Sequence, residues 1–173
     1  MHFVKAKGIL SSRNGMNLYR GCSHGCIYCD SRSRCYHMDH AFEDIEVKEN
    51  AVELLEYALK HKRKKCMIGT GAMTDPYIPL EMEIGNVRKA LKLICECGFG
   101  FTVITKSDRI LRDLDLLLKI NVCGGGSLWG DLFRHGIDAQ GGEQGIFLCA
   151  TGSPVSAAEG EIHTNVRKSV CDR

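Results

Sequence analysis

The first 121 residues alternate between short apolar runs and longer amphipathic stretches, and this alternation predicts the secondary structure. Short apolar runs predict strands at residues 16–19, 66–68 and 99–105. Apolar residues spaced three and four apart predict helices at residues 46–65, 80–97 and 110–120. Strands and helices that follow each other in this order predict an α/β fold, with a parallel sheet and right-handed crossovers.

The predicted helices also show where they end and which face they bury. The first has acidic residues early and basic residues late, as the helix dipole favours. Gly98 is the expected stop of the second helix. In the third helix, the spacing predicts four inward-facing leucines: Leu111, Leu114, Leu117 and Leu118.

The pattern changes near residue 121, where we expect the chain to divide. The first 121 residues hold nine glycines and the remaining 52 hold ten, and the balance of charge shifts from basic to acidic. In this second part, only residues 145–150 predict a strand. We therefore expect an N-terminal α/β part at residues 1–121 and a divergent, glycine-rich tail at residues 122–173. The tail is either a functional extension or, as we favour, sequence from a shifted reading frame or an altered gene end, with a disordered segment as a further alternative.

Composition places the chain among ordinary globular proteins. It is 44% hydrophobic and 25% charged, with a net charge of +2. No stretch approaches the ~18 apolar residues of a membrane-spanning helix, and the first residues lack the apolar core of a secretion signal. We therefore expect a cytoplasmic protein without membrane contact. The basic run at residues 61–65 is interpreted as a solvated helix end, with nucleic-acid binding as the weaker alternative.

Ten cysteines stand out in this composition. In a reducing compartment, so many thiols indicate metal ligands or reduced thiols rather than disulfides. Cys22, Cys26 and Cys29 form a C-x3-C-x2-C motif after the first predicted strand. Three close thiolates without a second Cys/His pair favour a [4Fe–4S] cluster, whose fourth iron is then open to a substrate or cofactor. The alternative is a zinc site completed by a fourth ligand from His24, Cys35 or His37.

The other candidate ligands receive simpler interpretations. Cys35 as a fourth cluster ligand would close the open iron, and we interpret it instead as a free thiol. Residues 37–40 (His-Met-Asp-His) have the composition of a metal site, but we interpret them as a polar loop before a helix start at residues 43–44. The remaining cysteines are interpreted as buried or reduced thiols: Cys66, Cys95, Cys97, Cys123, Cys149 and Cys171.

The cysteine motif, with Tyr28 directly before its last cysteine, resembles the signature of the radical S-adenosylmethionine (radical SAM) superfamily. Residues 69–79 (GTGAMTDPYIP) and 105–117 (TKSDRILRDLDLL) resemble the spore photoproduct lyase-like branch, whose members are often labelled DNA repair photolyases. The resemblance covers about residues 8–121. It implies a partial (β/α) barrel of which only three β/α units are recognisable, so that the chain looks truncated.

The resemblance also implies a chemistry. Cys22, Cys26 and Cys29 would ligate a [4Fe–4S] cluster, and the amino and carboxylate groups of S-adenosylmethionine would chelate its open iron. Reductive cleavage would release a 5′-deoxyadenosyl radical that abstracts hydrogen, in lyase-like or repair-like chemistry on an unknown substrate. An external electron donor of flavodoxin or ferredoxin type is the implied partner. The alternatives from another class are a non-catalytic cluster-binding or zinc-binding module and an inactive fragment.

The residues implied in S-adenosylmethionine binding lie after the second and third predicted strands. They are Gly69, Gly71, Thr74, Asp75, Lys106 and Ser107. Lys106 matches a lysine that contacts the methionyl carboxylate in spore photoproduct lyase, and Ser107 is its weaker neighbour. Ala72 and Met73 stand where that enzyme has a hydrogen-donating cysteine. The thymine-dimer reaction is therefore not expected of this chain.

Overall fold

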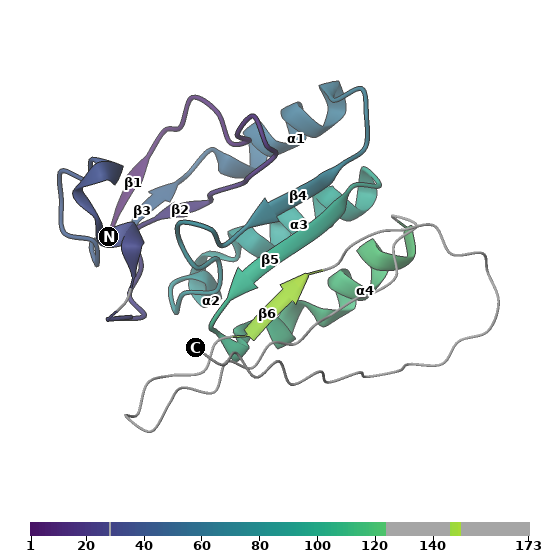
Figure 1. Cartoon of the computed structure of the whole chain (residues 1–173). Helices are drawn as coiled ribbons and strands as arrows, with labels where there is room; N and C mark the ends of the chain where they lie inside the picture. The colour runs from purple at the N-terminus through teal and green to yellow at the C-terminus, as the bar shows by residue number, and fades with distance from the viewer. Residues whose placement is uncertain (28, 124–145, 150–173) are drawn as a thin grey trace, which may run out of the picture.

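The computed structural model describes residues 1–27, 29–123 and 146–149, and these form two small sheets with helices beside them (Figure 1). The first sheet has the order β1-β3-β2, made of His2–Val4, Glu46–Lys48 and Tyr19–Arg20. The second has the order β4-β5-β6, made of Met67–Thr70, Gly100–Thr105 and Ile146–Cys149. The predicted α/β class is therefore confirmed.

Each sheet contains one parallel and one antiparallel pair, so the predicted parallel sheet is confirmed for part of each sheet only. β3 runs parallel to β1 and antiparallel to β2. β5 runs parallel to β4, as predicted, and antiparallel to β6. Over the residues that the structure describes, the strands do not close into a barrel.

The α-helices are α1 (Ala51–His61), α2 (Glu81–Ile84), α3 (Asn86–Glu96) and α4 (Leu114–Cys123). Three 3-10 helices accompany them: η1 (Asp30–Arg32), η2 (Arg34–Tyr36) and η3 (Asp108–Asp113). Figure 1 shows α1, α3 and α4 along one face of the β4-β5-β6 sheet. The core forms between these helices and that face, and its fully buried side chains include Leu55, Leu59, Leu91, Ile94 and Phe101. Burying each such side chain stabilises the fold by about 1.5–3 kcal/mol.

Two predicted helices have different bounds in the structure. Residues 46–48 of the first form β3 instead, because Val47 is buried between β1 and β2 and the flanking side chains alternate in exposure. The helix itself begins at Ala51 and ends at His61, and no helix starts at residues 43–44. The second predicted helix is split into α2 and α3 at Gly85, which has a left-handed φ of 69°. Gly98, with φ 65°, ends α3 as predicted.

The third predicted helix buries a different face. It starts as the 3-10 helix η3, whose three residues per turn shift the register of the side chains that follow. Leu111, Leu114 and Leu118 are therefore exposed, at 57%, 41% and 51%, and only Leu117 of the predicted set is buried. The buried face consists of Ile110, Leu116, Leu117 and Ile120.

The two sheets meet at a short seam. The predicted strand at residues 16–19 is reduced to β2, which begins at Tyr19. Just before it, Gly15 forms an isolated parallel bridge with Gly69 of β4. Met16 N donates to Gly69 O over 2.6 Å and Gly69 N donates to Asn14 O over 3.1 Å. This seam brings the segment that leads into the cysteine motif against β4.

The second part of the chain is described only in small part. The strand predicted at residues 145–150 is confirmed as β6. The rest of the predicted tail beyond residue 123 lies outside the described residues, and the boundary at residue 121 stays a prediction. In the described ranges, no helix is both long and apolar enough to cross a membrane.

Candidate metal and cofactor site

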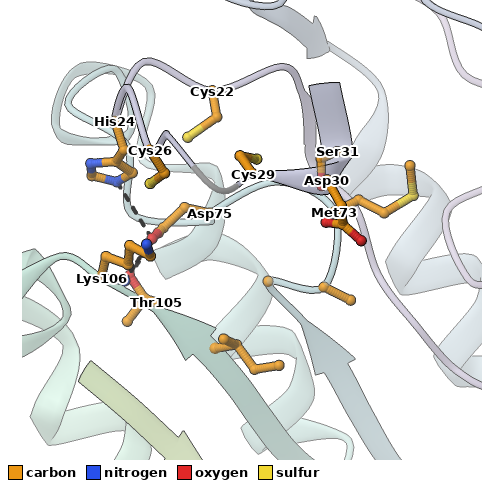
Figure 2. A pocket seen from close by; sticks show the side chains of 13 residues that line it. Cys22, His24, Cys26, Cys29, Asp30, Ser31, Met73, Asp75, Thr105 and Lys106 are labelled. Carbon is orange, nitrogen blue, oxygen red and sulfur yellow. Dashed lines mark hydrogen bonds and ion pairs between the residues drawn. The ribbon is translucent and has the colours of Figure 1, made fainter. Parts of the chain in front are cut away.

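A cavity of about 190 Å³ lies where the cysteine loop faces the carboxyl ends of β4 and β5 (Figure 2). The cysteine loop (residues 21–30) contributes Cys22, His24, Cys26, Cys29 and Asp30, with Ser31 beside it. The two strand ends contribute Gly71, Ala72, Met73, Asp75, Ile104, Thr105 and Lys106. Three segments far apart in the sequence therefore share one cavity. In α/β folds, ligands bind at this end of the strands.

The cysteine loop is fixed to the fold at its start. Gly21 has a left-handed φ of 90°, and a Cβ at this position would lie 2.5 Å from the backbone oxygen of Phe42. The next residue donates its backbone N–H to the same oxygen, over 3.0 Å. Only glycine allows this close approach. The loop therefore leaves β2 in one direction, with its thiols toward the cavity (Figure 2).

The three thiols differ in burial but share the cavity. Cys22 is buried, Cys26 and Cys29 are partly buried, and none of them forms a disulfide. Burial raises the pKa of the Cys22 thiol, so a positively charged metal centre is what would favour its thiolate. Three sulfur donors around one cavity fit an iron–sulfur cluster held at three corners.

The three candidates for a fourth zinc ligand lie in different places relative to the cavity. Cys35 is exposed on η2 and does not line the cavity. His37, in the left-handed region at φ 49°, does not line it either. His24 does line it. Of the three residues weighed as a fourth zinc ligand, only His24 is therefore placed at the thiols.

Asp75 connects the loop after β4 with the end of β5. Its Oδ1 accepts hydrogen bonds from Thr105 Oγ1 over 2.6 Å and from Tyr77 N over 2.8 Å. Its Oδ2 accepts a hydrogen bond from Lys106 N over 2.7 Å. The carboxylate thus holds two strand ends together beside the cavity, which makes Asp75 a positioning residue for the cavity wall.

His24 brings the cysteine loop to the same carboxylate. Its Nε2 lies 3.4 Å from Asp75 Oδ2, within ion-pair distance but without the alignment of a hydrogen bond. In the described part of the chain, this Nε2 is the single buried side-chain nitrogen or oxygen without a hydrogen bond. A buried polar atom without a partner is costly. An unpartnered donor or acceptor at the cavity fits a site that takes a polar ligand.

Asp75 stays charged in this setting. Burial alone would raise the pKa of its carboxyl group, but the nearby His24 and the hydrogen bonds from Thr105, Lys106 N and Tyr77 N outweigh the burial and hold the pKa below its usual range. The wall of the cavity therefore carries a fixed negative charge at neutral pH. That charge lies beside two cationic or polar side chains, those of His24 and Lys106 (Figure 2).

Gly71 has a role in the fold besides the predicted role in ligand binding, which stays a prediction. The sequence suggested that its missing Cβ would let a ligand approach. Gly71 lines the cavity with φ 95°, but a Cβ here would lie 1.9 Å from the backbone oxygen of Ile104. Glycine is therefore required for the close approach of the β4 loop to β5.

Three other predicted residues lie off the cavity. Gly69 lies within β4, and its backbone forms the hydrogen bonds of the seam between the two sheets. Thr74 is buried, and Ser107 caps η3 by accepting a hydrogen bond from Arg109 N over 3.3 Å. Of the predicted binding residues, the structure brings Gly71, Asp75 and Lys106 together with the three cysteines.

Several lining residues were missed by sequence reasoning. Thr105 directly precedes Lys106 at the end of β5, and its position after a β-branched strand was a usable signal. His24 lies inside the cysteine motif but was weighed only as a zinc ligand. Asp30, Ser31 and Ile104 gave no signal, and Met73 was considered only as a departure from the motif of the resembling family.

A buried charge network supports the site from behind. Tyr19, three residues before the motif begins, donates a short hydrogen bond to the carboxylate of Glu81, which is fully buried. The same carboxylate accepts hydrogen bonds from Val87 N over 3.1 Å and from the Arg112 guanidinium over 2.7 Å. The strand that carries the cysteine loop is therefore tied to α2 and α3.

A second buried carboxylate continues the network. Asp113 accepts hydrogen bonds from Tyr77 Oη over 3.2 Å, from Arg88 over 2.7 Å and from Arg112 over 2.9 Å. Tyr77 is the residue whose backbone N–H also bonds Asp75. The network thus connects η3 and α3 with the loop that forms the cavity wall.

Comparison with known families identifies the chain. The model of the radical SAM superfamily matches residues 16–138, which include all three cysteines and both strand ends of the cavity. The chain belongs to the radical SAM superfamily. A [4Fe–4S] cluster and S-adenosylmethionine are the general cofactors of radical SAM proteins, and the residues at the cavity fit the cluster.

Relatives among curated proteins have no stated function. An uncharacterized protein of Methanocaldococcus jannaschii is 34% identical over 108 residues, which cover 61% of this chain and 40% of that protein. Uncharacterized proteins of Mycobacterium bovis and Mycobacterium tuberculosis are 30% identical over 118 residues, covering 64% of this chain and 34% of theirs. The chain therefore spans well under half the length of these relatives. No solved structure matches it.

Proposed function

We propose that this radical SAM chain holds a [4Fe–4S] cluster on Cys22, Cys26 and Cys29 and binds S-adenosylmethionine in the adjoining cavity. The observation that carries the proposal is the convergence of three thiols and two strand ends on one cavity. When bound, the cluster supplies the electron that cleaves S-adenosylmethionine to a 5′-deoxyadenosyl radical. The protein's own residues hold and orient the two cofactors.

The polar residues of the cavity wall suit a methionyl group. Lys106 lines the cavity from the end of β5, where its ammonium group supplies positive charge for a carboxylate. Asp75 fixes the backbone of Lys106 and holds the loop after β4 in place. His24 offers a buried imidazole nitrogen on the opposite, cysteine-bearing side of the cavity.

The finer assignment is lyase-like or repair-like hydrogen abstraction, of the spore photoproduct lyase-like branch, on a partial barrel. It is supported by the placement of residues 69–79 and 105–117, because Gly71 and Asp75 of the first segment and Thr105 and Lys106 of the second line the same cavity. An external flavodoxin-type or ferredoxin-type donor completes the proposed reaction in a cytoplasmic setting.

Anaerobic reconstitution with iron and sulfide tests the proposal. We expect about four irons and four sulfides per chain, and a change in the cluster spectrum when S-adenosylmethionine is added. The matched control is Lys106→Met, which we expect to keep the iron content and weaken the response to S-adenosylmethionine. One zinc and no sulfide per chain would overturn the proposal in favour of a zinc-binding module. A cluster that does not respond to S-adenosylmethionine would leave only cluster binding.

A further inference from the structure

We infer that His2, His40 and Glu46 form a second metal site, for a zinc-type divalent ion, outside the three-cysteine cavity. Each residue offers one ligand atom, and these atoms lie within 4.8 Å of one another. None of the three residues lines the cavity. One of the three, His40, belongs to residues 37–40, which have the composition of a metal site but are interpreted from sequence as a polar loop.

The first sheet brings these residues together. His2 of β1 and Glu46 of β3 are direct neighbours in the parallel pairing of the two strands. His40 comes from the loop before β3, and its ring packs edge-on against that of His2, with ring centroids 4.8 Å apart. Two rings and a carboxylate therefore meet at one position over the sheet.

Each imidazole is oriented by a partner on its other nitrogen. Nδ1 of His2 lies 3.1 Å from Asp44 Oδ2, and Nδ1 of His40 lies 3.0 Å from the backbone oxygen of Ala41. Both oxygens can only accept, so the tautomer with its proton on Nδ1 satisfies them and leaves the lone pair of Nε2 for a metal ion. A carboxylate or carbonyl on the second nitrogen is the arrangement of metal-binding histidines.

The contact between His40 and Glu46 fits either a protonated Nε2 on His40 or a bound metal ion. Nε2 of His40 lies 3.4 Å from Oε2 of Glu46. With the His40 proton on Nδ1, this contact sets a lone pair against a carboxylate unless a second proton or a metal ion lies there. Neighbouring ligands of tetrahedral zinc lie about 3.3 Å apart, given Zn–N and Zn–O bonds of about 2.0–2.1 Å. The observed separation matches that spacing.

The donor set selects the kind of metal. Two imidazoles and one carboxylate suit zinc, with a fourth position left for water. His40 and Glu46 are mostly buried, with side chains 18% and 15% exposed, whereas His2 is 40% exposed, so an ion can enter from solvent. Arg20 of β2 lies 3.7 Å from Glu46 and also donates to the backbone oxygens of Tyr36 and His37. A bound ion would therefore fasten the segment after the cysteine loop to β1 and β3.

Zinc K-edge X-ray absorption tests the inference on the full chain without a polyhistidine tag. The cluster is first assembled anaerobically, so that iron occupies the three cavity thiols, and less than one equivalent of Zn²⁺ is added. We expect a shell of nitrogen and oxygen at about 2.0–2.1 Å, with the outer-shell signal of two imidazoles, and no sulfur at about 2.3 Å. If no cluster assembles, the measurement is made with Cys22, Cys26 and Cys29 replaced by Ser, which separates this site from the proposed function.

Variants assign the ion to these residues. We expect His40→Ala to lose the two-imidazole signal and Asp44→Asn to weaken zinc binding about 10–100-fold, because Asp44 orients His2. Glu46→Gln keeps the size of the side chain and serves where His40→Ala does not fold. His61→Ala, on the exposed end of α1, is the matched control and should bind zinc unchanged. Sulfur-ligated zinc, no bound zinc, or equal affinity in His40→Ala and the unmodified chain would overturn the inference.

Discussion

The backbone N–H of Lys106 donates a 2.7 Å hydrogen bond to the carboxylate of Asp75. The residue expected to meet the methionyl carboxylate at the end of β5 is thus held by a residue from the loop after β4. Because the same carboxylate bonds Thr105 and Tyr77 and approaches His24, one side chain sets the geometry of the cavity wall.

Replacing Asp75 tests this relationship. In Asp75→Asn, an amide nitrogen replaces one of the two carboxylate oxygens. This nitrogen cannot accept the hydrogen bonds that the oxygen accepted. We expect the free energy of unfolding to fall by about 1–3 kcal/mol, the cost of a buried group left without a partner. Urea unfolding measures the loss, with Asp108→Asn in the exposed first turn of η3 as the control. Equal midpoints for the two variants would contradict the positioning role of Asp75.

Single replacements of the loop cysteines test the ligand set. We expect Cys22→Ala, Cys26→Ala and Cys29→Ala each to abolish cluster assembly, because a cluster with two thiolates is not held. Cys35→Ala should assemble it normally, since Cys35 lies outside the cavity. Iron content and the visible absorbance of the reconstituted protein measure both effects. Loss of the cluster in Cys35→Ala would mean that all four irons have protein ligands, leaving no corner for S-adenosylmethionine.

Removing Glu81 tests the network behind the site. Glu81→Ala removes the shared acceptor of Val87 N and the Tyr19 hydroxyl, and one of the two carboxylates that pair with the Arg112 guanidinium. Breaking a buried pair on one side costs about 3–5 kcal/mol, and we expect thermal unfolding to shift down accordingly. Glu83→Ala, on the exposed side of the same short helix, should change stability little. Similar losses in both variants would show that the effect comes from helix α2 and not from the network.

Two tyrosines make the fold sensitive to alkaline pH. Burial, reinforced by Glu81, raises the pKa of Tyr19, and burial, reinforced by Asp113, raises the pKa of Tyr77, both far above the usual value of about 10. The unfolded chain ionises these phenols near pH 10 and the folded chain does not. Their contribution to stability is therefore complete at neutral pH and is lost as the pH rises above about 10.

Absorbance at 295 nm on the cluster-free protein follows this loss. We expect the two buried phenols to ionise only together with the loss of helical circular dichroism. Tyr19→Phe should move the midpoint of alkaline unfolding to a higher pH than in the unmodified chain. Tyr57→Phe, at an exposed position, should leave that midpoint unchanged. Ionisation of all five tyrosines while the helical signal persists would rule out the burial that the structure gives Tyr19 and Tyr77.

Sequence reasoning reached the parts of the site that depend on local order. Cys22, Cys26 and Cys29 share one loop, Asp75 lies in the loop after β4 and Lys106 directly follows β5, so spacing and strand ends were enough to place them. The helix predicted from residue 46 failed because Val47 is buried by β1 and β2, partners that are distant in the sequence. The leucine face of α4 failed because the 3-10 turn before it changes the register.

The second group of candidate ligands was out of reach for the same reason. His2 and Glu46 are neighbours only because β1 pairs with β3, and no local pattern in the first residues indicates that pairing. His40 joins them through the loop before β3. The sequence shows the two histidines but does not show that they lie close together in the fold.

The seam between the two sheets has a mechanical consequence. The cysteine loop follows a strand of the β1-β3-β2 sheet, and the opposite wall of the cavity follows strands of the β4-β5-β6 sheet. The backbone bridge between Gly15 and Gly69 joins the two sheets. A ligand bound by residues from both sheets would restrict the movement of one sheet relative to the other. Amide deuteration at Met16 and Gly69 should slow once the centre is loaded, which would let solvent exchange at two backbone positions report on occupancy without any spectral signal from iron.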